Sequence, residues 1–378
     1  MSEHTVELRV GGTLHRGFIG GSIVRSLEQP ASSFDLDYSP TATEGRAWPI
    51  EEGDECEIQI DGETILTGFV DRSEVQYDSD RIEYRVSGRS LVCDLVDCNT
   101  GAKTWRNKAL TDIAVELADG FRCGVAVLGD NGAPVGTFIR ARAATPATAT
   151  KPAQAARRAY TRFKTNAGET VIEAIRRAAG LRGLHLFDSP DGILVISLVG
   201  TDSANVTLGY NTPRVLKGSR SGDWSGRFST YHFCGQTSAT DELTGKAGRQ
   251  LLGEVDDPAL TSRDRHRPKI IVKRGGGGRQ DLGEQAVLER NRNAGRSERL
   301  RYTVNGWHDG NGDAWAPGTF VDVDDEKLRV QGRMIVVSAR YRFGPEEPFQ
   351  VELELTWPEA FDAENFPTRN RGDVWRVD

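Results

Sequence analysis

The chain has 378 residues, of which 27% are charged and 37% hydrophobic, and its net charge is −7. This length predicts about two to four domains with packed cores. No apolar run approaches the roughly 18 residues that a membrane helix needs, and the acidic balance argues against a dedicated nucleic-acid binder. The first ten residues, MSEHTVELRV, lack the basic and apolar regions of a signal peptide, so we expect the chain to be made and kept in the cytoplasm.

Residues 1–96 predict a compact β domain. Its strand candidates are Val6–Val10, Ser22–Leu27, Ser33–Tyr38, Glu55–Ile60, Glu63–Val70, Val75–Tyr77 and Ile82–Val86. Asp61-Gly62 between two alternating runs is a strong hairpin signal, because a type I′ turn needs positive φ at both positions. Gly88 is expected to mark the point where the backbone leaves the last strand. Strands this short and closely spaced favour a small barrel or sandwich.

Residues 97–203 predict an α/β domain. Trp105 leads into a helix with an apolar side, and Gly120 is expected to end that helix. Residues 145–158 are rich in Ala, Thr and Pro and predict a mobile surface loop. Thr170 and Glu173 form a capping box that begins a second helix. A hairpin over Asp188–Gly192 follows it.

Residues 204–357 return to a β pattern and predict a second β-barrel. The strand candidates are Phe228–Phe233, Tyr302–Asn305, Phe320–Val323, Met334–Tyr341 and Gln350–Leu355. Residues 236–300 differ from this pattern and predict an insertion that ends in a helix over about Leu282–Leu300. Residues 358–378 are polar and irregular, and we expect a C-terminal arm. The fold class is therefore α+β and mostly β, with two small β-barrels, an α/β domain between them and an inserted helical segment.

The cysteines are odd in number and scattered, at Cys56, Cys93, Cys98, Cys123 and Cys234. None forms Cys-x-x-Cys or lies near a histidine pair at zinc spacing, so we expect buried thiols and no metal site. The alternative is a disulfide formed outside the cell, with Cys93–Cys98 or an intersubunit pair as candidates.

No motif of the sequence predicts catalysis or a cofactor. Asp309–Asp313 resembles the start of a calcium loop, but Ala314 and Phe320 stand where an EF-hand needs Gly and Glu, so we expect a hairpin loop. Gly275–Gly278 lacks the Lys-Ser/Thr of a phosphate-binding loop. There is no Gly-x-Ser-x-Gly elbow and no His-Glu-x-x-His pair. We therefore expect a protein that is not an enzyme.

The one unusual charge feature is the segment Thr261–Arg301, which holds twelve Arg and Lys against five Asp and Glu. Such an excess is commonly a solvated face. The functional interpretation is a surface that contacts another subunit or partner, because arginine forks match carboxylates on an acidic neighbour. Under that interpretation, the candidate interface residues are Arg290, Arg292, Arg296 and Arg299.

A series of segments runs along nearly the whole chain: SIVRSLEQPASSFDLDYS, GDECEIQIDGETILTGFVD, the order Gly88-Arg89, Asp97-Cys98, Trp105-Arg106-Asn107, then ETVIEAIRRAAGLRGLHLFDSPDGILVIS, RDRHRPKIIV and GWHDGNGDAWAPGTFVDV. This series resembles the tail hub proteins of Mu-like contractile phages, which are related to the late control D proteins of other phages. The resemblance implies two tube-like barrels in each subunit and no cofactor.

The resemblance also implies a structural function. A homotrimer would present six barrels to a six-fold tail tube and join it to a three-fold central spike, in contact with other baseplate proteins. DNA would leave through its channel without specific binding, no membrane would be involved, and the protein, assembled in the host cytoplasm, would reside in the virion tail baseplate. The alternatives are a cell-wall-degrading baseplate hydrolase, which would need a placed pair of carboxylates, and a hub of a phage-derived particle without a genome.

Overall fold

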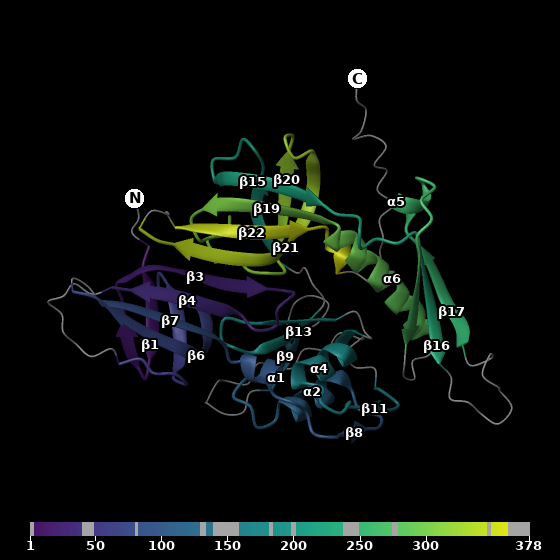
Figure 1. Ribbon diagram of the computed structural model, residues 1–378, viewed down its shortest axis with the longest axis horizontal. Helices are drawn as coiled ribbons and strands as arrows, with labels where there is room; N and C mark the ends of the chain where they lie inside the picture. The colour runs from purple at the N-terminus through teal and green to yellow at the C-terminus, as the bar shows by residue number, and fades with distance from the viewer. Residues whose placement is uncertain are drawn as a thin grey trace.

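The computed structural model describes residues 4–39, 49–79, 82–128, 134–138, 159–180, 184–197, 202–236, 249–273, 279–345 and 349–361. Figure 1 shows two β regions lying against each other, an α/β region below them and a long helix with a small sheet to one side. The predicted loop 145–158, the glycine run 275–278 and most of the predicted arm lie outside the described residues.

The first β region consists of seven strands whose inward-facing residues alternate with exposed ones. They are β1 (Val6–Val10), β2 (Thr13–His15), β3 (Phe18–Ser26), β4 (Ser33–Tyr38), β5 (Glu55–Ile60), β6 (Glu63–Tyr77) and β7 (Ile82–Ser90). The Asp61-Gly62 turn joins β5 to β6 with φ of 52° and 85°, as the hairpin prediction required. The two segments predicted at Glu63–Val70 and Val75–Tyr77 form one strand, because a bulge near Val70 keeps β6 paired with β7.

Gly88 does not end its strand, which corrects the prediction for this residue. Strand β7 continues to Ser90 and pairs with β4 and β6 on its two sides. A Cβ atom at Gly88 would lie 2.0 Å from the carbonyl oxygen of Phe69 and 2.8 Å from the ring of Phe34. Glycine is needed here because two neighbouring segments approach the backbone closely.

The α/β region has its own core. Its elements are α1 (Cys93–Asp97), β8 (Thr104–Trp105), α2 (Leu110–Ala118), β9 (Val125–Leu128), β10 (Pro134–Phe138), β11 (Phe163–Lys164), α4 (Val171–Gly180), β12 (His185–Asp188) and β13 (Leu194–Ser197). The capping box is confirmed, since the Thr170 amide donates to Glu173 Oε2 at 2.9 Å and the Glu173 amide to Thr170 Oγ1 at 3.3 Å. The predicted hairpin is confirmed as the antiparallel pair β12–β13.

The second β region shares a sheet with the first. Its strands are β14 (Ser203–Leu208), β15 (Val215–Gly222), β19 (Glu298–Asn305), β20 (Phe320–Asp325), β21 (Val330–Phe343) and β22 (Gln350–Thr356). Strand β21 pairs with β3, with Ser338 opposite Ser26, so one 13-stranded sheet runs through both regions. Their buried side chains also form one cluster. A mostly β fold is thus confirmed, while the strand order of the described residues runs from β15 to β2 without closing on itself.

A smaller sheet and a helix lie beside the second β region. The strands are β16 (Thr230–Gln236), β17 (Arg249–Asp256) and β18 (Pro268–Lys273), with the short helix α5 (Pro258–Thr261) after β17. Helix α6 (Arg279–Arg296) packs on this sheet through Ala286, which contacts Tyr231 and Phe233. The helix ends four residues before the predicted Leu300, because the alternation of β19 begins at Glu298.

Two further predictions can be compared with the structure. The predicted hairpin loop forms locally, since His308 and Ala314 face each other in an antiparallel bridge and the Asp309 amide donates to the Asp313 carbonyl oxygen at 2.8 Å. It does not join two paired strands, because β19 pairs with β15 and β22 whereas β20 pairs with β14 and β21. Asp309 closes the loop by accepting from the amides of Asn311 and Asp313. The described thiols of Cys56, Cys93 and Cys123 are free and buried, as predicted, whereas that of Cys98 is free but exposed, which corrects the prediction for this residue.

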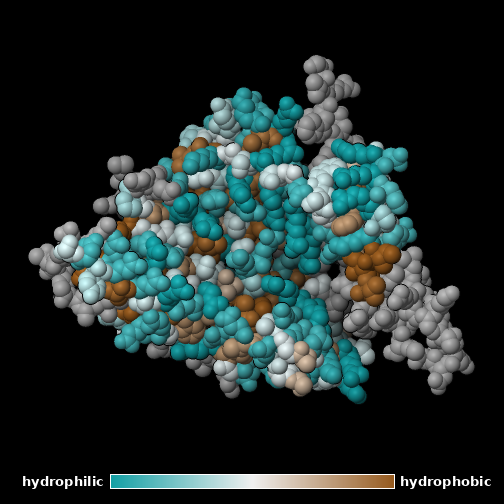
Figure 2. All heavy atoms as spheres, in the orientation of Figure 1, coloured by the Kyte–Doolittle hydropathy of each residue, from teal (hydrophilic) through white to brown (hydrophobic). Residues whose placement is uncertain are grey.

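The surface in Figure 2 is mainly hydrophilic, with hydrophobic side chains in small groups, one of them beside the small sheet. Ile270 and Val272 on β18 are among the exposed large hydrophobic residues. Among the described residues, no helix combines the length and apolar character needed to span a membrane.

Candidate functional site

A pocket lined by arginines lies where the α/β region, α6 and the second β region meet. We call it the arginine pocket. Its volume is about 170 Å³. Its described lining comprises Leu27, Glu28, Arg176, Gly180, Leu184, His185, Leu186, Arg292, Arg296, Arg299, Ala360 and Phe361. Figure 1 shows α6 running between the second β region and the small sheet, and its last turn supplies two of these arginines.

Arg299 and Arg296 share the one carboxylate of the arginine pocket. Arg299 Nη2 lies 2.5 Å from Glu28 Oε1, and its Nε lies 3.6 Å from Glu354 Oε1. Arg296 lies farther from Glu28, at 3.9 Å, and 65% of its side chain is exposed. Only 14% of the Arg299 side chain is exposed, and its Nη1 is buried without a hydrogen-bond partner. Arg299 is therefore a fixed part of the pocket wall, while Arg296 lies at the rim.

Arg292 and Arg176 bring charge to the pocket without a close ion pair among the described residues. Arg292 lies on α6 and Arg176 on α4. Burial lowers the pKa of both guanidinium groups. Glu173 opposes this for Arg176 and Glu289 opposes it for Arg292, whereas Arg296 and Arg176 lower the pKa of Arg292 further. Because arginine starts far above neutral pH, both remain charged. The pocket therefore holds positive charges that repel one another.

His185, on β12, forms a neutral part of the pocket. Its Nε2 lies 3.1 Å from the carbonyl oxygen of Phe361 and donates to it in the matching tautomer. Burial lowers the pKa of this imidazole to about 4, and the neighbouring Arg292 acts in the same direction. His185 is therefore uncharged at neutral pH.

Lowering the pH should destabilise the protein through His185. Its pKa in the folded state is below the unfolded value of about 6.5, so the unfolded state binds the proton first. The free energy of unfolding should fall between about pH 6.5 and 4, by roughly 3 kcal/mol if the full shift is expressed. Urea unfolding at several pH values measures this slope. His185→Gln should flatten it relative to the unchanged chain, and an equal slope in both would contradict the assignment.

The structure gathers three of the four predicted interface residues and separates the fourth. Arg292, Arg296 and Arg299 line the arginine pocket. Arg290 lies instead toward the small sheet, where its Nη1 donates to the carbonyl oxygen of Asp256 at 3.3 Å and its Nε to Asn291 at 3.2 Å. Helix geometry explains the split, since Arg292 and Arg296 are four residues apart on one face and Arg290 is two residues from Arg292.

Sequence reasoning missed Glu28, Arg176 and His185. Each is one polar residue next to a buried run, and no local pattern connects residue 28 with α4 or with α6. The only available signal was Arg176 itself, which interrupts the series of small apolar residues at the end of α4. The sequence pattern at Arg176 is equally consistent with an ordinary exposed helix residue.

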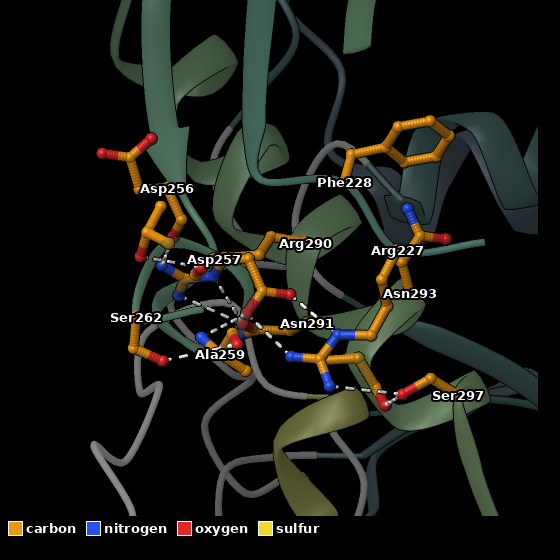
Figure 3. Close-up of polar contacts among 12 residues, drawn as sticks. Arg227, Phe228, Asp256, Asp257, Ala259, Ser262, Arg290, Asn291, Asn293 and Ser297 are labelled. Atoms are coloured by element: carbon orange, nitrogen blue, oxygen red, sulfur yellow. Dashed lines mark hydrogen bonds and ion pairs between the residues drawn. The ribbon is translucent and has the colours of Figure 1, made fainter. Parts of the chain in front are cut away.

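A second polar cluster, drawn in Figure 3, fixes the small sheet to α6 and β19. Arg227 faces Asp257, with Nε to Oδ2 at 2.8 Å and Nη2 to Oδ1 at 2.7 Å, and 3% and 0% of the two side chains are exposed. Asp257 also caps α5 by accepting from the amide of Ala259 at 3.0 Å. Ser297 lies 3.4 Å from Arg227 Nη1. All groups of this cluster have partners, so it is a structural element.

The described residues contain no group of three or more His, Cys, Asp or Glu side chains placed to hold a metal ion. What the arginine pocket can do chemically is bind negative charge, because guanidinium groups donate hydrogen bonds and accept none. It contains neither a nucleophile nor a titratable base close to neutral pH, since His185 is buried and neutral.

Three family models match successive parts of the chain. They are the N-terminal domain of the Mu phage baseplate assembly protein GpP-like family over residues 5–90, the second domain of the gp44-like baseplate hub protein over 147–198, and the fourth domain of the Mu phage baseplate assembly protein GpP over 281–364. Together they cover the first β region, part of the α/β region, and the second β region from β19 to β22.

Relatives match over nearly the full length. The chain is 27% identical to the baseplate hub protein gp44 of Escherichia phage Mu, over 93% of this chain and 90% of the relative. The crystal structure of the 43 kDa tail protein of prophage MuSo2 from Shewanella oneidensis matches with a TM-score of 0.78 and 28% identity, over 95% of this chain and 100% of that one. A tail protein from Neisseria meningitidis MC58 shares the fold, with a TM-score of 0.73, 24% identity and coverage of 94% and 98%.

The order of the matched domains, the full-length relative and the shared fold agree with one another. They also agree with the sequence segments that resembled tail hub proteins. The chain belongs to the baseplate hub protein family of Mu-like phages.

Proposed function

We propose that this baseplate hub protein assembles as a homotrimer that adapts a six-fold tail tube to a three-fold central spike. The observation that supports this is the joining of two β regions in one chain through the pairing of β21 with β3. Three copies would provide six such regions, the number that a six-fold ring needs. In this proposal each β region is one tube-like barrel unit, with domains at 1–96, 97–203, 204–357 and 358–378.

The place of the protein is the tail baseplate of the virion. We propose that its partners there are the spike, the tail tube and other baseplate proteins of a contractile tail, and that DNA passes through the channel of the trimer. The net charge of −7 suits a channel that does not hold phosphates. The hydrolytic alternative gains no support from the relatives, which are named hub or tail proteins.

Native mass spectrometry tests the trimer. The purified chain, alone or mixed with its spike protein, should give a species of three times 41.5 kDa. The reason is that a three-fold spike offers three equivalent positions, so closed cyclic symmetry favours three copies. Monomers and dimers alone, with the spike present, would contradict the adaptor function.

We further propose that three of the predicted interface residues, Arg292, Arg296 and Arg299, belong to a face that contacts a neighbouring subunit or baseplate protein. Arg290 is not part of this face, because it lies toward the small sheet. Arg296, exposed at the pocket rim, would make the direct contact. In native mass spectrometry, Arg296→Glu should reduce the assembled fraction severalfold. Thermal unfolding of the monomer should give a nearly unchanged melting temperature. The exposed Arg106, mutated to Glu, is the control. Particles that assemble normally but eject DNA at a changed rate would place this face in the lumen.

A further inference from the structure

We propose that the arginine pocket is a binding site for a small oxyanion of the phosphate class. The site is built from four separate segments of the chain. Glu28 follows β3, Arg176 lies on α4, Arg292 and Arg296 lie on α6, and Arg299 lies on β19. This inference concerns the isolated chain and does not depend on the number of subunits in the assembly.

Charge is the first argument. Four guanidinium groups face Glu28 in the described lining, and Glu354 lies 3.6 Å from Arg299, so the arginines exceed these two carboxylates by two positive charges. Glu28 is shared between Arg299 and Arg296, and neither Arg292 nor Arg176 forms a close ion pair among the described residues. Glu289 and Glu173, three residues earlier on the same helices, attract these two guanidinium groups without contacting them closely. A dianion such as hydrogen phosphate offsets more of this excess than the single charge of a carboxylate. Like charges held together in a partly buried space are unfavourable unless an opposite charge joins them.

The hydrogen-bond donors give the second argument. Nη1 of Arg299 is buried and has no hydrogen-bond partner, although a guanidinium group in a protein interior normally has all its donors occupied. Arg292 is also recessed, and the pocket brings both side chains to one space with Arg176 and Arg296. Phosphate presents several acceptor oxygens and matches the arginine fork in two-point hydrogen bonds.

The size of the pocket determines which phosphate-class ligand is suitable. Its volume of about 170 Å³ equals only a few water molecules of roughly 30 Å³ each. A duplex carries its phosphates on a convex surface and meets side chains that project from the protein. Arg292 and Arg299 are recessed instead, with 14% of Arg299 exposed. The geometry therefore favours a free small anion over a nucleic acid.

A bound oxyanion would connect α4 of the α/β region with α6 and β19. Arg176 belongs to the α/β region, whereas Arg292 and Arg299 belong to α6 and β19. In the same pocket, the hydrogen bond between His185 and the Phe361 carbonyl joins the α/β region to the last described residue of the chain. The anion would thus stabilise the folded state and reduce the repulsion among the arginines.

Isothermal titration of the full chain with inorganic phosphate, with chloride keeping the ionic strength constant, tests the proposal. We expect saturable binding of one phosphate with a dissociation constant below about 1 mM. Each lost charge-assisted contact should weaken binding about tenfold. Arg292→Gln should therefore weaken binding at least tenfold, and Arg176→Gln should weaken it severalfold. Arg106→Gln removes an exposed arginine outside the pocket and should leave binding unchanged.

Several results would overturn the proposal. One is the absence of saturable binding at phosphate concentrations up to about ten times the expected dissociation constant. Another is an equal loss in Arg106→Gln, which would indicate non-specific charge screening. Acetate or free glutamate binding as tightly as phosphate would identify a carboxylate site for a neighbouring protein, and Arg292-dependent binding of a short DNA duplex would identify a nucleic-acid contact. Should Arg292→Gln fail to fold, Arg176→Gln at the exposed rim makes the same test.

Discussion

Replacing Asp257 by alanine should lower the free energy of unfolding by about 3–5 kcal/mol, the usual cost of leaving one member of a buried ion pair without its partner. Arg227 would keep its charge with 3% of its side chain exposed and no ion pair to another carboxylate of the described residues. The substitution also removes the cap of α5, because Asp257 accepts the amide of Ala259. Both losses affect the segment that connects β17 with β18.

Urea unfolding and hydrogen exchange of the β16 amides measure this effect. We expect a lower unfolding midpoint together with faster exchange in Thr230–Gln236, because the small sheet depends on this cluster for its attachment to α6 and β19 (Figure 3). The control is the exposed pair Arg122–Glu55, at 2.8 Å with 67% and 44% of the side chains exposed. Glu55→Ala should change stability by less than about 1 kcal/mol.

The double substitution Arg227→Met and Asp257→Leu separates the cost of an unpaired charge from the value of the pair. Removing both charges together and filling the space with apolar groups should cost much less than Asp257→Ala alone. A double variant that is as unstable as the single one would mean that the pair itself, including its contact with Trp224 at 4.7 Å, is what stabilises the region.

Local patterns were sufficient where the neighbouring residues in sequence determine the structure. Strands β4 and β5 have the predicted ends, Ser33–Tyr38 and Glu55–Ile60, because alternation and turn residues specify them. The helix from Thr170 follows from its capping box in the same way. In each case the stabilising contact lies within a few residues of the signal.

Contacts between distant segments could not be predicted from the sequence. The pairing of β21 with β3 joins the two β regions, yet each strand alone shows only that it has a buried face. Gly88 is a further example, because its signal was interpreted as flexibility whereas the cause is the close approach of Phe69 and Phe34. The order of the strands and the close approach of backbone segments depend on residues that are distant in the sequence, which a local pattern does not identify.

The arginine pocket was predicted only in part for the same reason. The charge excess of Thr261–Arg301 identified a basic segment that includes Arg292, Arg296 and Arg299. The second half of the pocket comes from residues 28, 176 and 185, which the fold brings to α6 through the packing of the α/β region. The basic segment therefore predicted a region of positive charge, and the fold determines which of its arginines line the arginine pocket.

Trp105→Ala should also lower the free energy of unfolding by about 3–5 kcal/mol, in this case through loss of a large buried side chain. Trp105 is 5% exposed and belongs to the core of the α/β region, which includes Leu91 and Val92 directly after β7. Its ring lies 5.9 Å from that of Phe163, opposite which it pairs in the short sheet β8–β11. Alanine would leave a cavity in this core, which adds to the loss of apolar contacts.

Two further variants separate the contributions of the ring contacts and of the indole hydrogen bond to the lower free energy of unfolding. Trp105→Phe keeps most of the ring contacts and removes the indole N–H, which donates to Glu116 Oε2 at 2.6 Å, so it should cost clearly less than alanine. Glu116→Gln keeps an acceptor at nearly the same place and should change stability by about 1 kcal/mol or less. Thermal and urea unfolding, followed together with soluble yield, measure all three variants. If Trp105→Ala leaves the melting temperature unchanged, the side chain contributes little to this core, and the indole would then be assigned to a contact with another subunit.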